Sequence, residues 1–305
     1  MTIPASVKIV EVGPRDGLQN EAQSVPPDVK IRLIEKLVDA GLPVVESGAF
    51  VSPKWVPQMA DSAEVFKAVQ KRAGVSYPML VPNMKGLEAA LDAGVEEIAI
   101  FAAATDSFSQ KNINCSIDES IERFRLVVER AIAQNIKVRG YISCVLGCPY
   151  EGEVSMAVVA GIAKTMLDQG CYEISLGDTI GVGTPGKAQA MIEQVSKVVP
   201  IHQLAAHFHD TYGQGLANLY AVLQSGISVI DSSVSGLGGC PYAKGASGNV
   251  ATEDVVYMLQ GMNIKTGVDM NKLLDAGTYI SQYIGREPAS KAALALSKRR
   301  ASRRG

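Results

Sequence analysis

Two short segments in the second half of the chain concentrate the residue types that can do chemistry. The segment 235–249 carries one cysteine, Cys240, and one asparagine, Asn249, among five glycines. Glycines at this density allow sharp turns and close approach to a ligand, which a purely structural connection rarely needs. The segment 207–210 reads His-Phe-His-Asp and holds two of the three histidines of the chain. These segments indicate a reactive loop and a histidine cluster that belong to one site.

The two clustered histidines predict half of a metal site. His207 and His209 are two residues apart, so on a strand both side chains point to the same face. A carboxylate oxygen from Asp16 and an amide oxygen from Asn249 would complete the ligand set. Such a mixture of nitrogen and oxygen ligands suits Mg²⁺, Mn²⁺ or a similar divalent ion better than a thiolate zinc site does. The alternative is that both histidines are core residues bonded to their neighbours. Their position on one face of the strand and the adjacent Asp210 favour a metal.

Further polar residues lie where strands of the expected fold end. Arg15 is either a partner in a buried ion pair or a cation that stabilises an oxyanion on a carbonyl or thioester, and we favour the second role. Glu46 and Asp178 are either bonded to polar groups of the fold or proton-handling carboxylates. Cys240 is either incidental or a thiol acid–base group, and its place in the glycine-rich loop favours catalysis.

The elements that must position these residues follow from hydrophobic periodicity. Apolar, β-branched runs occupy residues 7–12, 44–46, 77–81, 97–101, 137–144, 172–176, 204–209 and 229–234. Amphipathic segments lie between them, at 28–40, 62–70, 85–93, 120–134, 154–169, 187–198 and 215–226. Eight strands that alternate with helices predict an α/β fold, a (β/α)₈ TIM barrel, whose strand ends and following loops build the active site.

A doubly wound open sheet is the competing fold. The segment 181–186 matches the pattern GxGxxG after a predicted strand. However, no acidic residue ends a following strand at the expected distance of about 20 residues, and the match lies past the middle of the chain. We therefore interpret the segment as a tight turn with Pro185 at a helix start.

The chain of 305 residues is predicted to form a single domain. The TIM barrel would span residues 1–250 and carry a glycine-rich lid loop at 235–249. C-terminal helices, expected near 252–260 and 271–283, and a basic tail would fill 251–305. We interpret the tail from Ser297 as a solvated, frayed end. Binding of acyl-carrier phosphates by this tail is the minority interpretation.

Charge and composition limit the partners. The net charge is −2 with both signs interspersed, which argues against a nucleic acid or an acidic membrane and favours a small molecule. A predicted strand follows the first residues at once, and no apolar run approaches about 20 residues, so we expect a cytoplasmic protein. Five cysteines without a CxxC pair indicate free thiols, with Cys144 and Cys148 as small packing residues.

Seven segments of this chain resemble the 3-hydroxy-3-methylglutaryl-CoA (HMG-CoA) lyases, a family of the DRE-TIM metallolyase group. The segments are 13–21, 50–59, 111–115, 143–152, 177–186, 207–213 and 235–254. The likeness covers nearly the whole chain, and the pattern of the last segment is highly specific.

The resemblance implies a reaction and assigns residues to it. The reaction is the retro-Claisen cleavage of (S)-3-hydroxy-3-methylglutaryl-CoA to acetoacetate and acetyl-CoA, as in leucine catabolism or ketone body formation. The metal ligands would be Asp16, His207, His209 and Asn249. The catalytic residues would be Arg15, Cys240, Asp178, Glu46 and His207. The resemblance also suggests a homodimer.

Departures from the family pattern leave other substrates open. Gly48 and Ala49 stand where bulkier or hydroxyl residues are expected, which would admit another branched 3-hydroxy-acyl-CoA. Ala22 stands where a lysine can grip the phosphates of CoA. A Claisen-type synthase is disfavoured because the stretch after the loop leaves no room for an accessory domain. A catalytically silent barrel that serves as a binding subunit is the alternative from another class, and it need not carry this whole set of residues.

Overall fold

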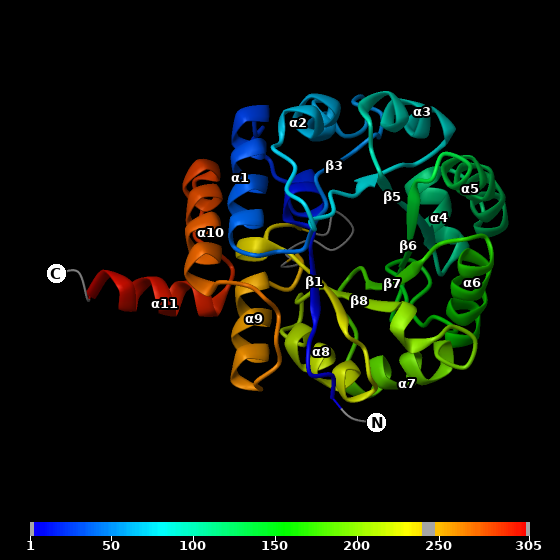
Figure 1. The fold of residues 1–305 in the computed structure, drawn as a ribbon. Helices are drawn as coiled ribbons and strands as arrows, with labels where there is room; N and C mark the ends of the chain where they lie inside the picture. Colours follow the sequence, from blue (N-terminus) through cyan, green and yellow to red (C-terminus); the bar gives the residue numbers. More distant parts are fainter. Residues whose placement is uncertain (1–2, 240–247, 303–305) are drawn as a thin grey trace.

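The computed structural model describes residues 3–239 and 248–302, and within them the strands form one parallel sheet that curls into a barrel (Figure 1). Cys240 and most of the predicted lid loop lie outside the described residues. The strands are β1 (Lys8–Glu11), β2 (Val44–Val45), β3 (Gly48–Ala49), β4 (Met79–Leu80), β5 (Glu97–Ala103), β6 (Lys137–Ser143), β7 (Glu173–Asp178), β8 (Leu204–Phe208) and β9 (Val229–Ser232). Each runs parallel to its neighbours, as short buried runs separated by helices require.

The short strands β2 and β3 are two halves of one barrel strand. β2 pairs with β1 and β3 pairs with β4, and the chain changes partner at Glu46 and Ser47. The Glu46 N–H donates to the Glu11 carbonyl at 2.9 Å, and the Ser47 N–H donates to the Pro78 carbonyl at 3.0 Å. These bonds join both sides of the sheet, so the barrel is closed. The TIM-barrel prediction is confirmed, and the doubly wound alternative is wrong.

Helices surround the barrel in the order that the periodicity predicts (Figure 1). They are α1 (Pro27–Asp39), α2 (Ser62–Ala68), α3 (Met84–Ala93), α4 (Asp106–Ile113), α5 (Ile117–Ile132), α6 (Met156–Asp168), α7 (Pro185–Val195) and α8 (Gly215–Gln224). Helix α7 begins at Pro185, and Gly181 before it has a φ of +66°, which confirms the tight turn. Hydrophobic periodicity did not predict α4, because its polar sequence lacks a clear apolar face. No helix in the described part of the chain is both long and apolar enough to cross a bilayer.

Three helices follow the barrel: α9 (Thr252–Gly261), α10 (Met270–Ile284) and α11 (Lys291–Ser302). Helix α10 packs beside α1, and α11 packs against α9 and projects away from the barrel in Figure 1. The expectation of a frayed tail from Ser297 is therefore wrong as far as Ser302. Asp254 explains the difference, because its carboxylate accepts the Ala292 N–H at 2.7 Å and the Ser290 hydroxyl at 2.8 Å, which caps the start of α11.

Two buried glutamates hold the turn that follows β9. Glu11 accepts the Gly13 and Val234 N–H groups, each at 2.8 Å, and Glu253 accepts the Ser235 N–H at 2.9 Å. Burial raises the pKa of Glu11 to about 7, although Thr252 and these backbone donors oppose the rise. Burial likewise raises the pKa of Glu253 to about 8. Ser235 itself has a φ of +58°, so two carboxyl groups fix a strained turn at the start of the glycine-rich loop.

The raised pKa of Glu253 predicts a pH-dependent stability. Its stabilising contribution is complete below its ordinary value of 4.5 and is lost as pH rises through about 8. We expect the substitution Glu253→Gln to reduce the loss of unfolding free energy between about pH 5 and about pH 8 by roughly 1–3 kcal/mol. Urea denaturation followed by circular dichroism at both pH values measures this. An equal loss in the wild type and the variant would contradict the prediction.

Candidate active site

A short π-helix, η1 (Gly13–Gly17), turns the chain sharply after β1 and presents Arg15 and Asp16 at the barrel mouth. The Gly17 N–H donates to the Val12 carbonyl at 3.1 Å, which is the wide ring of a π-turn. Gly13 is required here, because a Cβ atom would lie 2.6 Å from the Glu11 carboxylate. A buried glutamate and a glycine therefore set the direction of the two charged residues that follow.

Arg15 lies between two carboxylates. Its Nε donates to Glu46 Oε2 at 2.7 Å, its Nη1 donates to Asp16 Oδ1 at 2.6 Å, and its guanidinium lies 5.5 Å from the centre of the Tyr141 ring. Burial raises the pKa of Glu46, and the charge of Arg15 opposes that rise. Burial would also raise the pKa of Asp16, but Arg15 and the two histidines lower it to about 2. Asp16 is therefore ionised at neutral pH.

Asp16, His207 and His209 form the predicted cluster. They come from η1 and from the end of β8, and one ligand atom of each lies within 4.8 Å of the others. His207 Nε2 is 3.8 Å from Asp16 Oδ2. Asn249 joins them, because its Nδ2 donates to Asp16 Oδ2 at 2.7 Å and its backbone forms a β-bridge with His209. The amide oxygen of Asn249 is left as its candidate ligand atom.

The donor set of this cluster fits a divalent metal. Within the described residues, Nδ1 of His209 is buried and has no hydrogen-bond partner, which is costly for a ring nitrogen unless a ligand meets it. Burial and the neighbouring His207 lower the pKa of His209 to about 4, so this imidazole is neutral. An ionised carboxylate and a neutral imidazole are the protonation states that metal binding needs.

Charged residues inside the barrel, which the sequence analysis missed, support His207. Its Nδ1 lies 3.1 Å from Asp231 Oδ2 on β9. Arg139 on β6 donates to both oxygens of Asp231, at 3.0 and 2.8 Å, and its Nε donates to Glu173 Oε1 at 2.7 Å. Burial would raise the pKa of Asp231, but Arg139 and His207 hold it well below its usual range. Arg139 and Asp231 stand within predicted buried strands. Charged residues at such positions indicate that buried partners exist, but not which residues they are.

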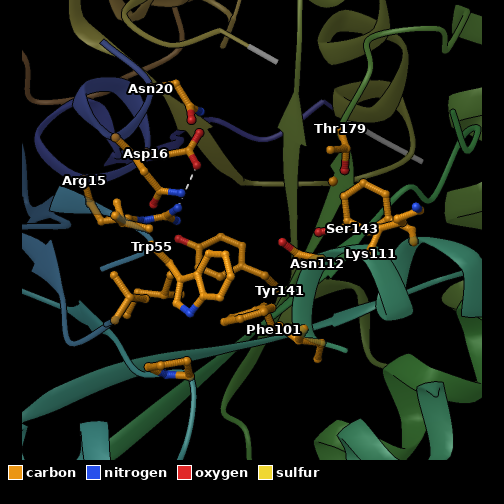
Figure 2. Close-up of a pocket in the computed structure, with 18 of the residues that line it drawn as sticks. Arg15, Asp16, Asn20, Trp55, Phe101, Lys111, Asn112, Tyr141, Ser143 and Thr179 are labelled. Atoms are coloured by element: carbon orange, nitrogen blue, oxygen red, sulfur yellow. Dashed lines mark hydrogen bonds and ion pairs between the residues drawn. The ribbon is translucent and has the colours of Figure 1, made fainter. Parts of the chain in front are cut away.

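The cluster opens into a cavity of about 720 Å³. Figure 2 shows Arg15 and Asp16 on one side of the cavity and Lys111 and Thr179 on the other. Polar residues line the cavity beside the metal cluster and also on the far side, and between them lies an apolar group made of Val51, Trp55, Val56, Leu80, Pro82, Phe101, Phe108, Ile113 and Ile142. The volume is within the range of small-molecule sites. No catalytic or binding role was predicted for any of these apolar residues from the sequence.

Asp178 lies outside the metal cluster and bonds to backbone groups. The Asp178 carboxylate accepts the Val182 N–H at 3.2 Å and the Gly183 N–H at 2.8 Å, so it holds the loop before α7. Burial raises its pKa to about 6 against these donors. Its neighbours Gly177 and Thr179 line the cavity. A catalytic part for Asp178 stays a prediction, as does one for Cys240, which lies outside the described residues.

The chain is similar in sequence to members of one enzyme family. The model of the HMGL-like family matches residues 6–280. A mitochondrial hydroxymethylglutaryl-CoA lyase from Bos taurus is 62% identical over 297 residues, which cover 97% of this chain and 91% of the relative. A 3-hydroxy-3-isohexenylglutaryl-CoA/hydroxy-methylglutaryl-CoA lyase from Pseudomonas aeruginosa is 60% identical, with 97% of this chain and 99% of the relative covered.

The fold agrees with these sequence matches. The crystal structure of a hydroxymethylglutaryl-CoA lyase from Pseudomonas aeruginosa superposes with a TM-score of 0.96 at 60% identity, over 98% of this chain and all of that one (100%). The matched region contains every residue of the cluster at the barrel mouth. The chain belongs to the HMGL-like family.

Proposed function

We propose that this protein is a carbon–carbon lyase that cleaves HMG-CoA to acetoacetate and acetyl-CoA with a divalent metal ion. The observation that carries the proposal is the cluster of Asp16, His207 and His209 beside Arg15 in a cavity of about 720 Å³. The names of the relatives support the substrate. The oxygen donors of Asp16 and Asn249, with no thiolate in the ligand set, favour Mg²⁺ or Mn²⁺ over a thiolate-bound zinc ion.

The reaction breaks the bond between C2 and C3 of the acyl group. Asp16, His207, His209 and Asn249 would hold the divalent ion, which would supply Lewis-acid chemistry that lowers the pKa of the 3-hydroxyl. The 3-hydroxyl loses its proton to a base, C3 becomes the ketone of acetoacetate, and the electron pair passes to the acetyl-CoA enolate. Arg15 carries a fixed positive charge that stabilises the enolate oxygen.

Other residues of the site prepare Arg15 and complete the proton transfers. Glu46 holds the guanidinium through Nε and Nη2, both at 2.7 Å, so Arg15 needs little rearrangement as negative charge develops on the substrate. Cys240 is our candidate for the acid that protonates the enolate carbon. We further propose that the enzyme is a homodimer and acts in the cytoplasm.

The second prediction concerns metal-dependent cleavage. Purified protein with HMG-CoA and Mg²⁺ or Mn²⁺ should form acetoacetate, and chelation should abolish the reaction until metal is added back. The substitution His207→Ala removes one ligand and should lower kcat/KM by at least about 10³-fold. A coupled acetoacetate assay measures both effects. Cleavage that is unchanged in chelator would contradict the metal proposal, and no cleavage despite bound metal would contradict the substrate.

The third prediction concerns the charge of Arg15. The substitution Arg15→Met should lower kcat by roughly 10²–10³-fold or more, because it removes the charge that faces the enolate oxygen. Arg125→Met is the matched control, since Arg125 pairs with Glu122 and Glu129 on the surface of α5. Steady-state kinetics should show wild-type kcat for the control. An equal loss in both variants would contradict a role in catalysis for Arg15.

A related substrate is the second candidate, and the apolar wall of the cavity favours it. Trp55, Leu80 and Phe101 offer more apolar surface than the methyl group of HMG-CoA needs. The Pseudomonas aeruginosa relative is named for a 3-isohexenyl substrate as well as for HMG-CoA. A longer branched group at C3 would pack against this wall.

The fourth prediction tests this second substrate. The protein should cleave 3-hydroxy-3-isohexenylglutaryl-CoA with a kcat/KM within about 10-fold of that for HMG-CoA. Leu80→Asn should lower this value for the longer substrate more than for HMG-CoA, because it replaces an apolar contact with an amide. Competition kinetics with both substrates give the ratio directly. A rate for the longer substrate that is about 10³-fold lower would rule out the second candidate.

A further inference from the structure

We propose that Asp231 is a positioning residue for the metal ligand His207, and that Arg139 and Ser175 hold its carboxylate for this task. The proposal rests on the metal-dependent function proposed above and deepens it. It concerns a residue on β9 that approaches the metal cluster only through the imidazole of His207.

The other partners of Asp231 show which residue supplies the hydrogen between Asp231 and His207. Asp231 Oδ2 accepts from Arg139 Nη1 at 3.0 Å and from the Ser175 hydroxyl at 2.7 Å, and Asp231 Oδ1 accepts from Arg139 Nη2 at 2.8 Å. A carboxylate with these three donors is an acceptor only. The hydrogen between Asp231 and His207 therefore belongs to Nδ1 of His207, 3.1 Å away.

The other ring nitrogen of His207, Nε2, faces the metal cluster. A hydrogen on Nδ1 leaves Nε2 of a neutral imidazole as the lone-pair nitrogen. In His207 this nitrogen lies on the side of Asp16, 3.8 Å from its Oδ2. Edge-on contact with the Tyr141 ring, at 5.9 Å between centres, further fixes the ring plane. A carboxylate behind a metal-bound histidine orients it and raises its basicity.

His207 and His209 differ in the partners of their Nδ1 atoms. Nδ1 of His207 has Asp231, whereas Nδ1 of His209 has no partner among the described residues. Both rings are buried, and their centres are 5.6 Å apart. Of these two histidines, His207 alone has an Nδ1 partner within the described residues, and this partner sets which ring nitrogen faces the metal cluster. Asp231 is itself fully enclosed, at 1% exposure, so it touches neither the cavity nor a substrate.

The fifth prediction compares two variants of the same network. Asp231→Asn should weaken Mn²⁺ binding by about 10–100-fold, the usual effect of losing such a carboxylate. Glu173→Gln is the matched control, because Glu173 pairs with the same Arg139 but has no bond to His207. Its Mn²⁺ affinity should stay within about threefold of the wild type. The signal of free Mn²⁺ in electron paramagnetic resonance measures each dissociation constant, and circular dichroism verifies folding.

Imidazole ¹⁵N spectra of the full chain with Mg²⁺ provide a readout that does not depend on any variant. The chain has only three histidines, so their signals can be assigned. His207 should carry its proton on Nδ1, and a proton on Nε2 would overturn the proposal even if Asp231→Asn fails to fold. Equal Mn²⁺ affinity in Asp231→Asn and the wild type, or equal losses in both variants, would also overturn it. A wild-type chain that binds no Mn²⁺ would instead refute the metal-dependent function.

Discussion

The structure depends on the pairing of two buried guanidinium groups, those of Arg15 and Arg139, with carboxylates. A charge without a partner is too costly to bury, so each guanidinium in the interior meets carboxylates. Arg139 lies between Glu173 and Asp231, and Arg15 lies between Glu46 and Asp16. The two sets of pairs meet at His207, which contacts Asp231 on one side and Asp16 on the other. The same contacts therefore pair the buried charges of the fold and orient the residues of the site.

Periodicity and strand ends accounted for most of the fold and for the centre of the site. The alternation of His207, Phe208 and His209 placed both histidines on one face, and Phe208 packs in the core as that pattern requires. Asp16 and Asn249 are 233 residues apart, yet they are hydrogen-bonded. Their proximity could be anticipated because a closed parallel barrel brings all of its strand ends to one mouth.

What the sequence concealed depends on long-range partners. Arg139 and Asp231 lie inside strands whose apolar neighbours dominate the pattern, and one sequence does not say which charge meets which. The basic composition after Ser297 indicated a frayed end, whereas capping of α11 by Asp254 depends on a contact between residues 38 positions apart. The π-turn at Arg15 has a similar origin, because it needs the Glu11 carboxylate behind Gly13. Local propensity does not contain such contacts.

The position of Trp55 has an optical consequence. It is the only tryptophan of the chain, it lines the mouth of the cavity, and it is 81% exposed. An indole that already meets water changes its surroundings little when the barrel melts, so its emission is a poor measure of unfolding. A ligand that covered this indole would remove it from water. The fluorescence of the protein is therefore expected to report occupancy of the cavity, without any added dye.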